Sequence, residues 1–265
     1  MAYLKKGIYP AVLIFSFALL AFLESRLKFD FQVISSISLT ITISLVILLE
    51  KVVPYRKDWS YSPEDRHMDF FFTMILFPVI VTINQLLVKA LPASLQMMDL
   101  TSMSMAVQVA LPLLISEFLF YFSHRLSHEN PILWKLHFRH HQVKRVYWMN
   151  SGTFNPADLF LNFFIYCLPF AFFKTDALAI QYALYFSATT GLMEHANVDF
   201  RAGALNYIFN TAELHRWHHS VVVEESQTNY GKALSIFDFL FRTLKFEPKK
   251  NVAEVGVKPV GINNI

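Results

Sequence analysis

Histidines dominate the side chains of this sequence that could do chemistry. The chain has ten histidines in 265 residues. The stretch SHRLSHENPILWKLHFRHH at 123–141 holds five of them, and LHRWHHS at 214–220 holds three more. His195 stands between these groups in MEHANVD, and only His67 lies outside the set. Because imidazole is the commonest metal ligand in proteins, this density predicts a metal site.

The spacing of the histidines favours helices that present several rings on one face. His124 and His128 are four residues apart, and both triplets have the spacing i, i+3, i+4. Adjacent histidines in a triplet are splayed by about 100° on a helix, so they can reach two different ions. Nine nitrogens are too many for one ion. The sequence therefore predicts two ions with four or five histidine ligands each, drawn from His124, His128, His137, His140, His141, His195, His215, His218 and His219.

The elements that must position these side chains are membrane helices. Hydrophobic residues make up 54% of the chain and charged residues only 16%, and the mean hydropathy is +0.38. Apolar runs at 8–23, 31–49, 70–91 and 106–122 are close to the length that a bilayer requires. We read the first run as an uncleaved span rather than a signal peptide. The single cysteine, Cys167, excludes an internal disulfide and a cysteine-based metal or haem site.

Two shorter apolar runs, 159–173 and 177–193, predict a helical hairpin, and Pro131 should end or restart the helix between the first two histidine groups. The predicted fold is an all-α polytopic membrane protein with four transmembrane helices, this hairpin and a cytoplasmic helical cap that carries the histidines. We divide the chain into a transmembrane region (1–122), a histidine-rich region (123–247) that includes the hairpin (157–194), and a loosely ordered tail (248–265).

The positive charges predict the orientation in the membrane. With the N-terminus in the cytoplasm, 19 of the 23 Lys and Arg residues fall on the cytoplasmic side. The nine clustered histidines then also lie on that side. We expect an integral protein of the bacterial inner membrane, or of the endoplasmic reticulum if the source is eukaryotic, with its active site facing the cytoplasm.

An all-histidine site brings no negative charge, so we expect nearby carboxylates to orient the ring N–H groups. Glu117 lies seven residues, or about two turns, before His124 and on roughly the same helix face. Arginines interleave the histidines but cannot bind a metal, and they should meet carboxylates, lipid headgroups or a partner. The candidate carboxylates are Glu117, Glu129, Glu194, Asp199 and Glu213, and the arginines are Arg125, Arg139 and Arg216.

These motifs resemble the three histidine boxes of the fatty acid hydroxylase and sterol desaturase superfamily. The boxes are HRLSH at 124–128, HFRHH at 137–141 and HRWHH at 215–219, supported by PILW at 131–134, HANV at 195–198 and NYG at 229–231. The resemblance implies a non-haem di-iron oxygenase with two iron ions, for which zinc could substitute in a purified sample, and O2 as co-substrate. It carries the nine histidines over as ligands, with no catalytic residues beyond them, and suggests that Asn229 reaches a metal through water.

The resemblance also implies the partners. The substrate would be a lipid from the bilayer, and hydroxylation or desaturation of its C–H bonds needs electrons from outside. The chain has no flavin, haem or iron–sulfur motif, so we expect a donor such as cytochrome b5 or ferredoxin with its reductase, attracted to the basic cytoplasmic face. We expect no nucleic-acid partner. Four aromatic side chains could line the substrate site or form an interfacial belt: Trp134, Phe138, Trp148 and Trp217.

Other readings of the histidines fit less well. A haem electron carrier would need histidine pairs on different spans, a zinc protease would need HExxH, and a transporter would place its ligands near the membrane midplane. A histidine-rich membrane protein that binds metal or transfers electrons without oxygenase activity is the alternative from another class. Within the oxygenases, hydroxylation, desaturation and alkylglycerol-type ether cleavage all fit, as do sterol, acyl-chain and carotenoid substrates.

Overall fold

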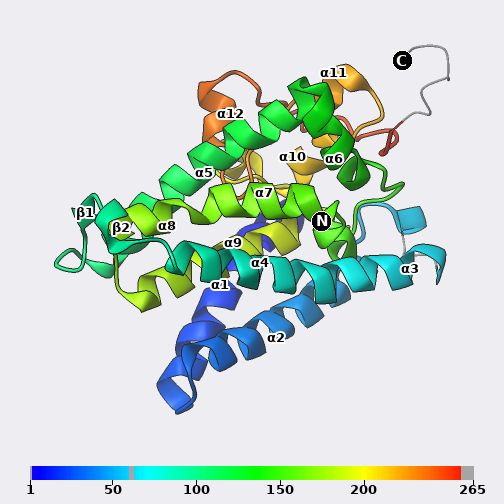
Figure 1. The fold of residues 1–265 in the computed structure, drawn as a ribbon. Coiled ribbons are helices and arrows are strands. Elements are labelled where there is room, and N and C mark those ends of the chain that lie inside the picture. Colours follow the sequence, from blue (N-terminus) through cyan, green and yellow to red (C-terminus); the bar gives the residue numbers. More distant parts are fainter. Residues whose placement is uncertain (1, 60–62, 258–265) are drawn as a thin grey trace.

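The computed structural model describes residues 2–59 and 63–257, and this part of the chain is mainly helical (Figure 1). Two strands of two residues each, β1 and β2, pair in parallel. The elements in chain order are α1 (Ala2–Arg26), α2 (Phe31–Val52), η1 (Lys57–Trp59), α3 (Pro63–Phe70), η2 (Phe71–Leu76), α4 (Phe77–Lys89), η3 (Ala93–Leu95), β1 (Met98–Asp99), α5 (Met105–Glu129), α6 (Pro131–His141), η4 (Trp148–Gly152), α7 (Pro156–Cys167), α8 (Pro169–Phe172), β2 (Phe173–Lys174), α9 (Ala177–Glu194), η5 (Gly203–Tyr207), α10 (Ala212–His218), α11 (Val223–Ser226) and α12 (Ile236–Leu240).

The four predicted spans are confirmed as long apolar helices. They run from Lys5–Arg26, Phe31–Val52, Asp65–Lys89 and Met105–Glu129, each long enough to cross a membrane. The third span is continuous through α3, a π-helical segment η2 and α4. Helices α7, α8 and α9 form the predicted hairpin. Helices α7 and α8 lead away from the histidine region, and α9 returns to it.

Helices α5, α7 and α9 occupy the middle of the molecule (Figure 1). Helices α1 and α2 pack against each other and against α9, whereas α4 packs against α7. Helix α6 folds back against the end of α5. The α1–α2 turn and the β1–β2 pair lie at one end of the molecule, and α6, α10 and α11 lie at the other (Figure 1). This arrangement brings the histidine-bearing segments together at one end of the bundle.

Helix α6 begins where the sequence predicts a break. Asn130 is its N-cap, and the side-chain Oδ1 of Asn130 accepts hydrogen bonds from the backbone N–H groups of Ile132 and Leu133 at 2.9 and 3.2 Å. Pro131 occupies the first helical position, where its missing N–H costs no hydrogen bond. The cap therefore fixes the point at which the chain turns back from α5 and directs the second histidine group toward the first.

The segment after α12 corrects the prediction of a loose tail. Val252 and Val255 are buried against Trp59, Val146 and Trp217. The backbone N–H of Gly256 donates to the carbonyl oxygen of His219 at 2.9 Å. The sequence-based expectation is wrong for residues 251–256, because these apolar side chains find a partner surface that the local sequence does not reveal. Residues 258–265 lie outside the described part of the chain.

Candidate metal centre

The nine clustered histidines lie in two groups, each with converging ring nitrogens. Within a group, one nitrogen from every ring lies within 4.8 Å of the others. The first group has five members and the second has four, as the sequence predicts. The first group is His124, His128, His137, His141 and His218, and the second is His140, His195, His215 and His219.

Each group draws on segments that are distant in the sequence. The first combines α5 and α6 with the last residue of α10, and the second combines α6, the end of α9 and α10. Adjacent histidines separate as predicted: His140 and His141 belong to different groups, and so do His218 and His219. Neither the 123–141 stretch nor the 215–219 box is therefore a complete site.

Hydrogen bonds fix the tautomer of three rings in the first group. The Nδ1 atoms of His124 and His218 lie 2.7 and 2.8 Å from the carbonyl oxygens of Tyr230 and Thr228. The Nδ1 atom of His137 lies 2.9 Å from the carboxylate of Asp158. These oxygens only accept, so in each ring Nδ1 carries the proton and Nε2 carries a lone pair.

Those lone pairs face each other. The Nε2 atom of His124 is 3.0 Å from Nε2 of His137 and 3.0 Å from Nε2 of His218. Neutral imidazoles in these tautomers have no proton to share at these contacts, so the arrangement is repulsive unless a cation lies between them. Two nitrogens about 2.1 Å from one metal and at right angles to each other would be about 3 Å apart. The residues of the first group therefore fit a bound metal ion.

In the second group, a hydrogen bond fixes the tautomer of His195. The Nδ1 atom of His195 lies 3.0 Å from Oδ1 of Asn150, whose amide nitrogen donates to the carbonyl oxygen of Arg145 at 2.6 Å. The lone pair of His195 Nε2 then faces Nε2 of His215 at 2.9 Å. His215 Nε2 is also 3.1 Å from Nε2 of His219. This group also fits a metal ion.

Burial keeps these rings in the protonation state that a metal requires. Burial lowers the pKa of His195 to about 3. It also lowers the pKa values of the buried rings on α6 and around α10, and repulsion from neighbouring histidines lowers them further; this set is His140, His141, His215, His218 and His219. Their nitrogens are therefore neutral at neutral pH and free to bind a cation.

Most of the carboxylates that the sequence suggested have other partners. Glu117 accepts hydrogen bonds from the Tyr166 hydroxyl at 3.0 Å and from the backbone N–H groups of Ala233 and Leu234 at 2.9 and 3.0 Å. It therefore joins α5 and α7 to the C-terminal segment instead of orienting a histidine. Two helical turns, about 11 Å along the axis, separate it from His124, which is too far for a hydrogen bond.

Asp199 and Asn229 also have partners of their own, whereas Glu194 keeps an oxygen that has no hydrogen-bond partner among the described residues and stays a candidate. Asp199 pairs with Lys5 and Arg201. Asn229 donates to the carbonyl oxygens of Leu214 and Lys245 and accepts from the Lys245 N–H, so its side chain organises backbone and does not face the metal groups. Of the remaining carboxylates, Glu129 pairs with Arg125 on the surface, Glu213 accepts from Ala202 and Asn206, and Glu194 lines the cavity described below.

Sequence reasoning missed Asp158, the carboxylate that does orient a ligand. It is buried in the first turn of α7, and besides contacting His137 it accepts from Asn162 Nδ2 at 2.7 Å. The Asn162 amide oxygen accepts from the Ser123 hydroxyl at 2.9 Å. A lone aspartate at the start of an otherwise apolar helix was the available signal.

The three arginines that lie between the histidines in the sequence contact different partners. Arg125 meets Glu129 at 2.7 Å, as expected. Arg139 lies over the ring of Phe72 at 4.2 Å. Arg216 is buried; it stacks on Tyr55 at 3.8 Å and donates to the carbonyl oxygen of Val198 at 3.1 Å, and burial lowers its pKa to about 10. It therefore fixes α10 to the loop that follows His195.

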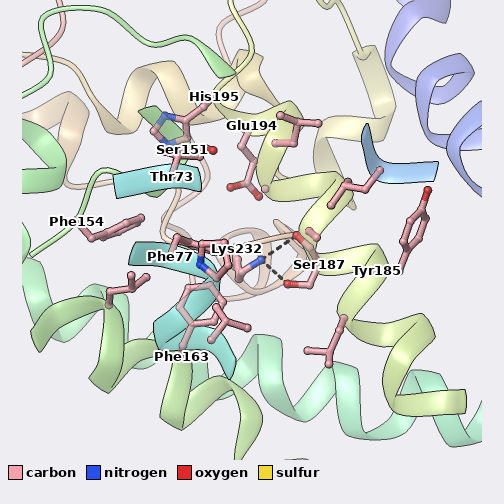
Figure 2. Close-up of a pocket in the computed structure, with 18 of the residues that line it drawn as sticks. Thr73, Phe77, Ser151, Phe154, Phe163, Tyr185, Ser187, Glu194, His195 and Lys232 are labelled. Atoms are coloured by element: carbon pink, nitrogen blue, oxygen red, sulfur yellow. Dashed lines mark hydrogen bonds between the residues drawn. The ribbon is translucent and has the colours of Figure 1, made fainter. Parts of the chain in front are cut away.

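A cavity of about 510 Å³ extends from the histidines between α2, α4 and α9 (Figure 2). Rings from both metal groups line one end, including His137 and His195, and apolar side chains line most of the rest. Of the four aromatics predicted near the site, Trp148 lines the cavity, and Trp134, Phe138 and Trp217 are not among the lining residues of the described chain. The cavity is of the size and character that small-molecule sites usually have.

Comparison with known proteins decides the family. The family model for fatty acid hydroxylase matches residues 109–243. The chain belongs to the fatty acid hydroxylase family. Ornithine lipid hydroxylase OlsE of Rhizobium tropici is 32% identical over 227 residues, which cover 82% of this chain and 68% of that protein.

Other relatives of this chain are similar to it over a shorter length. Alkylglycerol monooxygenase of Caenorhabditis elegans is 30% identical over 51% of this chain and 26% of its own length. Methylsterol monooxygenase 2-2 of Arabidopsis thaliana is 24% identical over 53% of each chain. The comparison with solved structures gives no match. Family membership and these relatives make the chain an oxidoreductase of the lipid hydroxylase type, embedded in a membrane through its apolar helices.

Proposed function

We propose that this chain is a di-iron lipid hydroxylase in which all nine clustered histidines are ligands. The observation that supports this most strongly is the convergence of the Nε2 atoms of His124, His137 and His218, which a bound metal ion would stabilise. Iron is the proposed metal because the family's chemistry uses O2. When bound, the two irons supply the oxidising power: R–H, O2, two electrons and two protons give R–OH and water.

The protein's own side chains orient the histidine ligands and exclude water from the metals. Asp158 holds the His137 ring and raises the electron density on its metal-facing nitrogen. Asn150 does the same for His195 without adding charge. All nine rings are buried, so bulk water is kept from the metals and from the carbon being oxidised.

The substrate is proposed to reach the histidines from the bilayer. Helices α2 and α4 both line the cavity, but they pack against different neighbours. Helix α2 packs against α1 and α9, and helix α4 packs against α7. Serine and glutamine side chains on the cavity side of α2 (Gln32, Ser35, Ser36) and Gln85 of α4 line the part farther from the metals. A lipid chain entering between α2 and α4 would lie along this space with its reactive part at the histidines.

An ornithine lipid is the proposed substrate class. The Rhizobium tropici relative is named for hydroxylation of ornithine lipid, and its similarity extends over most of both chains. The alkylglycerol monooxygenase similarity covers about a quarter of that relative, so ether cleavage has weaker support. Hydroxylation is accordingly favoured over desaturation.

The electron donor is proposed to dock at the cytoplasmic end of the bundle. The charge distribution supports a cytoplasmic location for the histidine end, where α6, α10 and α11 lie (Figure 1). A small acidic carrier such as cytochrome b5 or ferredoxin, with its reductase, would suit this basic face.

The test is expression in a bacterium that makes unmodified ornithine lipid, followed by mass spectrometry of the membrane lipids and metal analysis of the purified protein. We expect ornithine lipid with one added oxygen atom, and about two irons per chain. His137→Ala should yield no oxidised lipid, whereas His67→Ala, which alters an exposed histidine, should behave like wild type. A purified wild-type protein with haem absorbance, or with far less than two metals per chain from iron-replete cells, would refute the di-iron proposal.

A further inference from the structure

The apolar cavity contains a buried lysine and a buried glutamate near the second metal group. Lys232 and Glu194 are only 9% and 6% exposed, and both line the cavity. Figure 2 shows their side chains in the space between His195 and Ser187. Neither residue belongs to the two histidine groups. Charged groups are costly to bury unless they are paired, so each needs an explanation.

Lys232 is held in place but keeps hydrogen-bonding capacity. Its Nζ donates to the carbonyl oxygen and the hydroxyl of Ser187 at 3.1 and 2.6 Å, and it lies 5.1 Å from the centre of the Tyr166 ring. An ammonium group has three N–H donors, so these two bonds leave one for a ligand. The ammonium group lies close to α9, since a Cβ built on Gly191 would be in ordinary van der Waals contact with Nζ at 3.7 Å.

Glu194 has an unsatisfied oxygen. Its Oε1 is buried and has no hydrogen-bond partner in the described part of the chain. Ser187, Gly191 and Glu194 follow one face of α9 at i, i+4 and i+7, so the glutamate points into the same space as the lysine (Figure 2). The other buried carboxylate close by, Glu117, already accepts three hydrogen bonds. Glu194 is therefore the carboxylate that a ligand would satisfy.

We propose that Lys232 and Glu194 form a headgroup subsite for a zwitterionic lipid. The free donor of Lys232 would bind an anionic group of the lipid, and the carboxylate of Glu194 would bind a cationic one. An apolar lipid would leave the third N–H donor of Lys232 and the Oε1 atom of Glu194 without a hydrogen-bond partner, and a lipid with one charge would satisfy only one of them. The inference rests on the proposed function, since it concerns the substrate of the same cavity.

The position of the pair fits an N-acylated amino acid. Such a headgroup keeps its carboxylate for Lys232, and ornithine adds a side-chain ammonium for Glu194. Glu194 is the residue before His195, and apolar side chains together with the serines and glutamines of α2 and α4 line the rest of the cavity. A headgroup held by the pair places its own carbon atoms next to the metals, while the acyl chains occupy the rest of the cavity.

The experiment measures binding of three lipids with identical acyl chains to the purified full-length protein loaded with metal, by competition in detergent micelles. The probes are ornithine lipid, its N-acetylated derivative, which lacks the cation, and its carboxyl methyl ester, which lacks the anion. Wild type should bind each derivative at least about tenfold more weakly than the parent, as expected for one lost charged hydrogen bond.

Each variant should lose one of these preferences. Glu194→Gln should bind the parent and the N-acetylated lipid alike and still reject the ester, and Lys232→Met should do the reverse, with Lys232→Gln as a second variant if the first does not purify. Exposed matched controls are Glu224→Gln and Lys28→Met, which should keep both preferences. Every variant is also assayed for metal content.

Two results would overturn the inference. One is wild-type binding that does not distinguish the three lipids, and the other is loss of metal from Glu194→Gln, which would assign Glu194 to the metal centre. Neither result decides the proposed hydroxylase activity, because that is measured by oxidised product. Conversely, an inactive wild type that still shows the charge preferences would refute the proposed function and leave the subsite standing.

Discussion

His140 and His141 are neighbours in the sequence, yet their ring planes lie 88° apart with centroids separated by 5.4 Å, and each ring faces a different metal group. His218 and His219 repeat this relationship with an angle of 87° and a separation of 5.6 Å. One turn of helix in each box therefore contributes to both histidine groups, so the two groups share their scaffold.

This sharing predicts unequal effects of single alanine variants. His141→Ala leaves four histidines in its group, whereas His140→Ala leaves three. We expect His140→Ala to retain about one metal per chain after dialysis against a chelator. We expect His141→Ala to lose the ion of the first group more slowly than His140→Ala loses the ion of the second group. Inductively coupled plasma mass spectrometry gives the count, with exposed His67→Ala as the control. Two tightly held ions in both variants would contradict the division into groups.

Asp158 should raise the affinity of the first histidine group for its metal ion without binding the ion itself. Asp158→Asn keeps a hydrogen-bond acceptor for His137 but removes the negative charge that strengthens this ligand. We expect metal affinity to fall by about 10–100-fold, measured by competition with a chromogenic chelator. Asp99→Asn, which alters a half-exposed surface pair with Lys174, is the matched control. Equal affinities for Asp158→Asn and wild type would show that the Asp158 contact has no influence on the metal.

The metal-free protein should be sensitive to acid. Burial lowers the pKa of His195 to about 3, whereas an unfolded chain has a histidine pKa of about 6.5. The unfolded state thus takes up protons that the folded state excludes. The stability that this neutral ring contributes is complete above about pH 6.5 and is lost progressively as the pH falls from there toward 3.

We therefore expect the Tm of the metal-free protein in detergent to fall steadily as the pH decreases from about 7 to about 5. The exposed His67 should contribute little, so His67→Ala should follow the wild-type curve. A Tm that stays constant over this range would mean that the rings are not buried in the metal-free state.

Position 231 requires glycine because the backbone of Leu234 and the side chain of Asp238 approach it closely. A Cβ at this position would lie 2.2 Å from the carbonyl oxygen of Leu234 and 2.9 Å from a carboxylate oxygen of Asp238. The same carboxylate accepts the Gly231 N–H at 2.8 Å. Gly231→Ala should destabilise the protein by about 1–3 kcal/mol, seen as a lower Tm. Gly7→Ala, where nothing lies within 4 Å of the new methyl group, should be neutral or slightly stabilising.

Narrowing the cavity should separate lipid binding from metal binding. Ala188 lines the cavity on α9, so Ala188→Trp would occupy space proposed for the substrate. We expect lipid affinity to fall by about tenfold or more, with both metals retained. Ala11→Trp, on an exposed face of α1, controls for adding a tryptophan to a membrane helix. Unchanged lipid affinity in Ala188→Trp would place the substrate elsewhere.

The local features of this protein were predictable from sequence because their causes are local. Hydropathy over about 20 residues identifies a membrane span, and the i, i+4 rule places His124 and His128 on one helix face. The splay of adjacent residues on a helix predicted that His140 and His141 would face different partners, and they belong to different histidine groups. Helix geometry alone determines each of these outcomes.

Contacts across long sequence distances were decided only by the tertiary structure. The proton on His124 is fixed by a carbonyl oxygen 106 residues away, and the ring of His218 meets His124 across 94 residues. Spacing on the helix favoured Glu117 as a partner of the histidines, but packing gave that role to Asp158 on α7. The cavity with Lys232 and Glu194 exists only because α2, α4 and α9 assemble around it, since a cavity is shaped by non-local packing that no local pattern encodes.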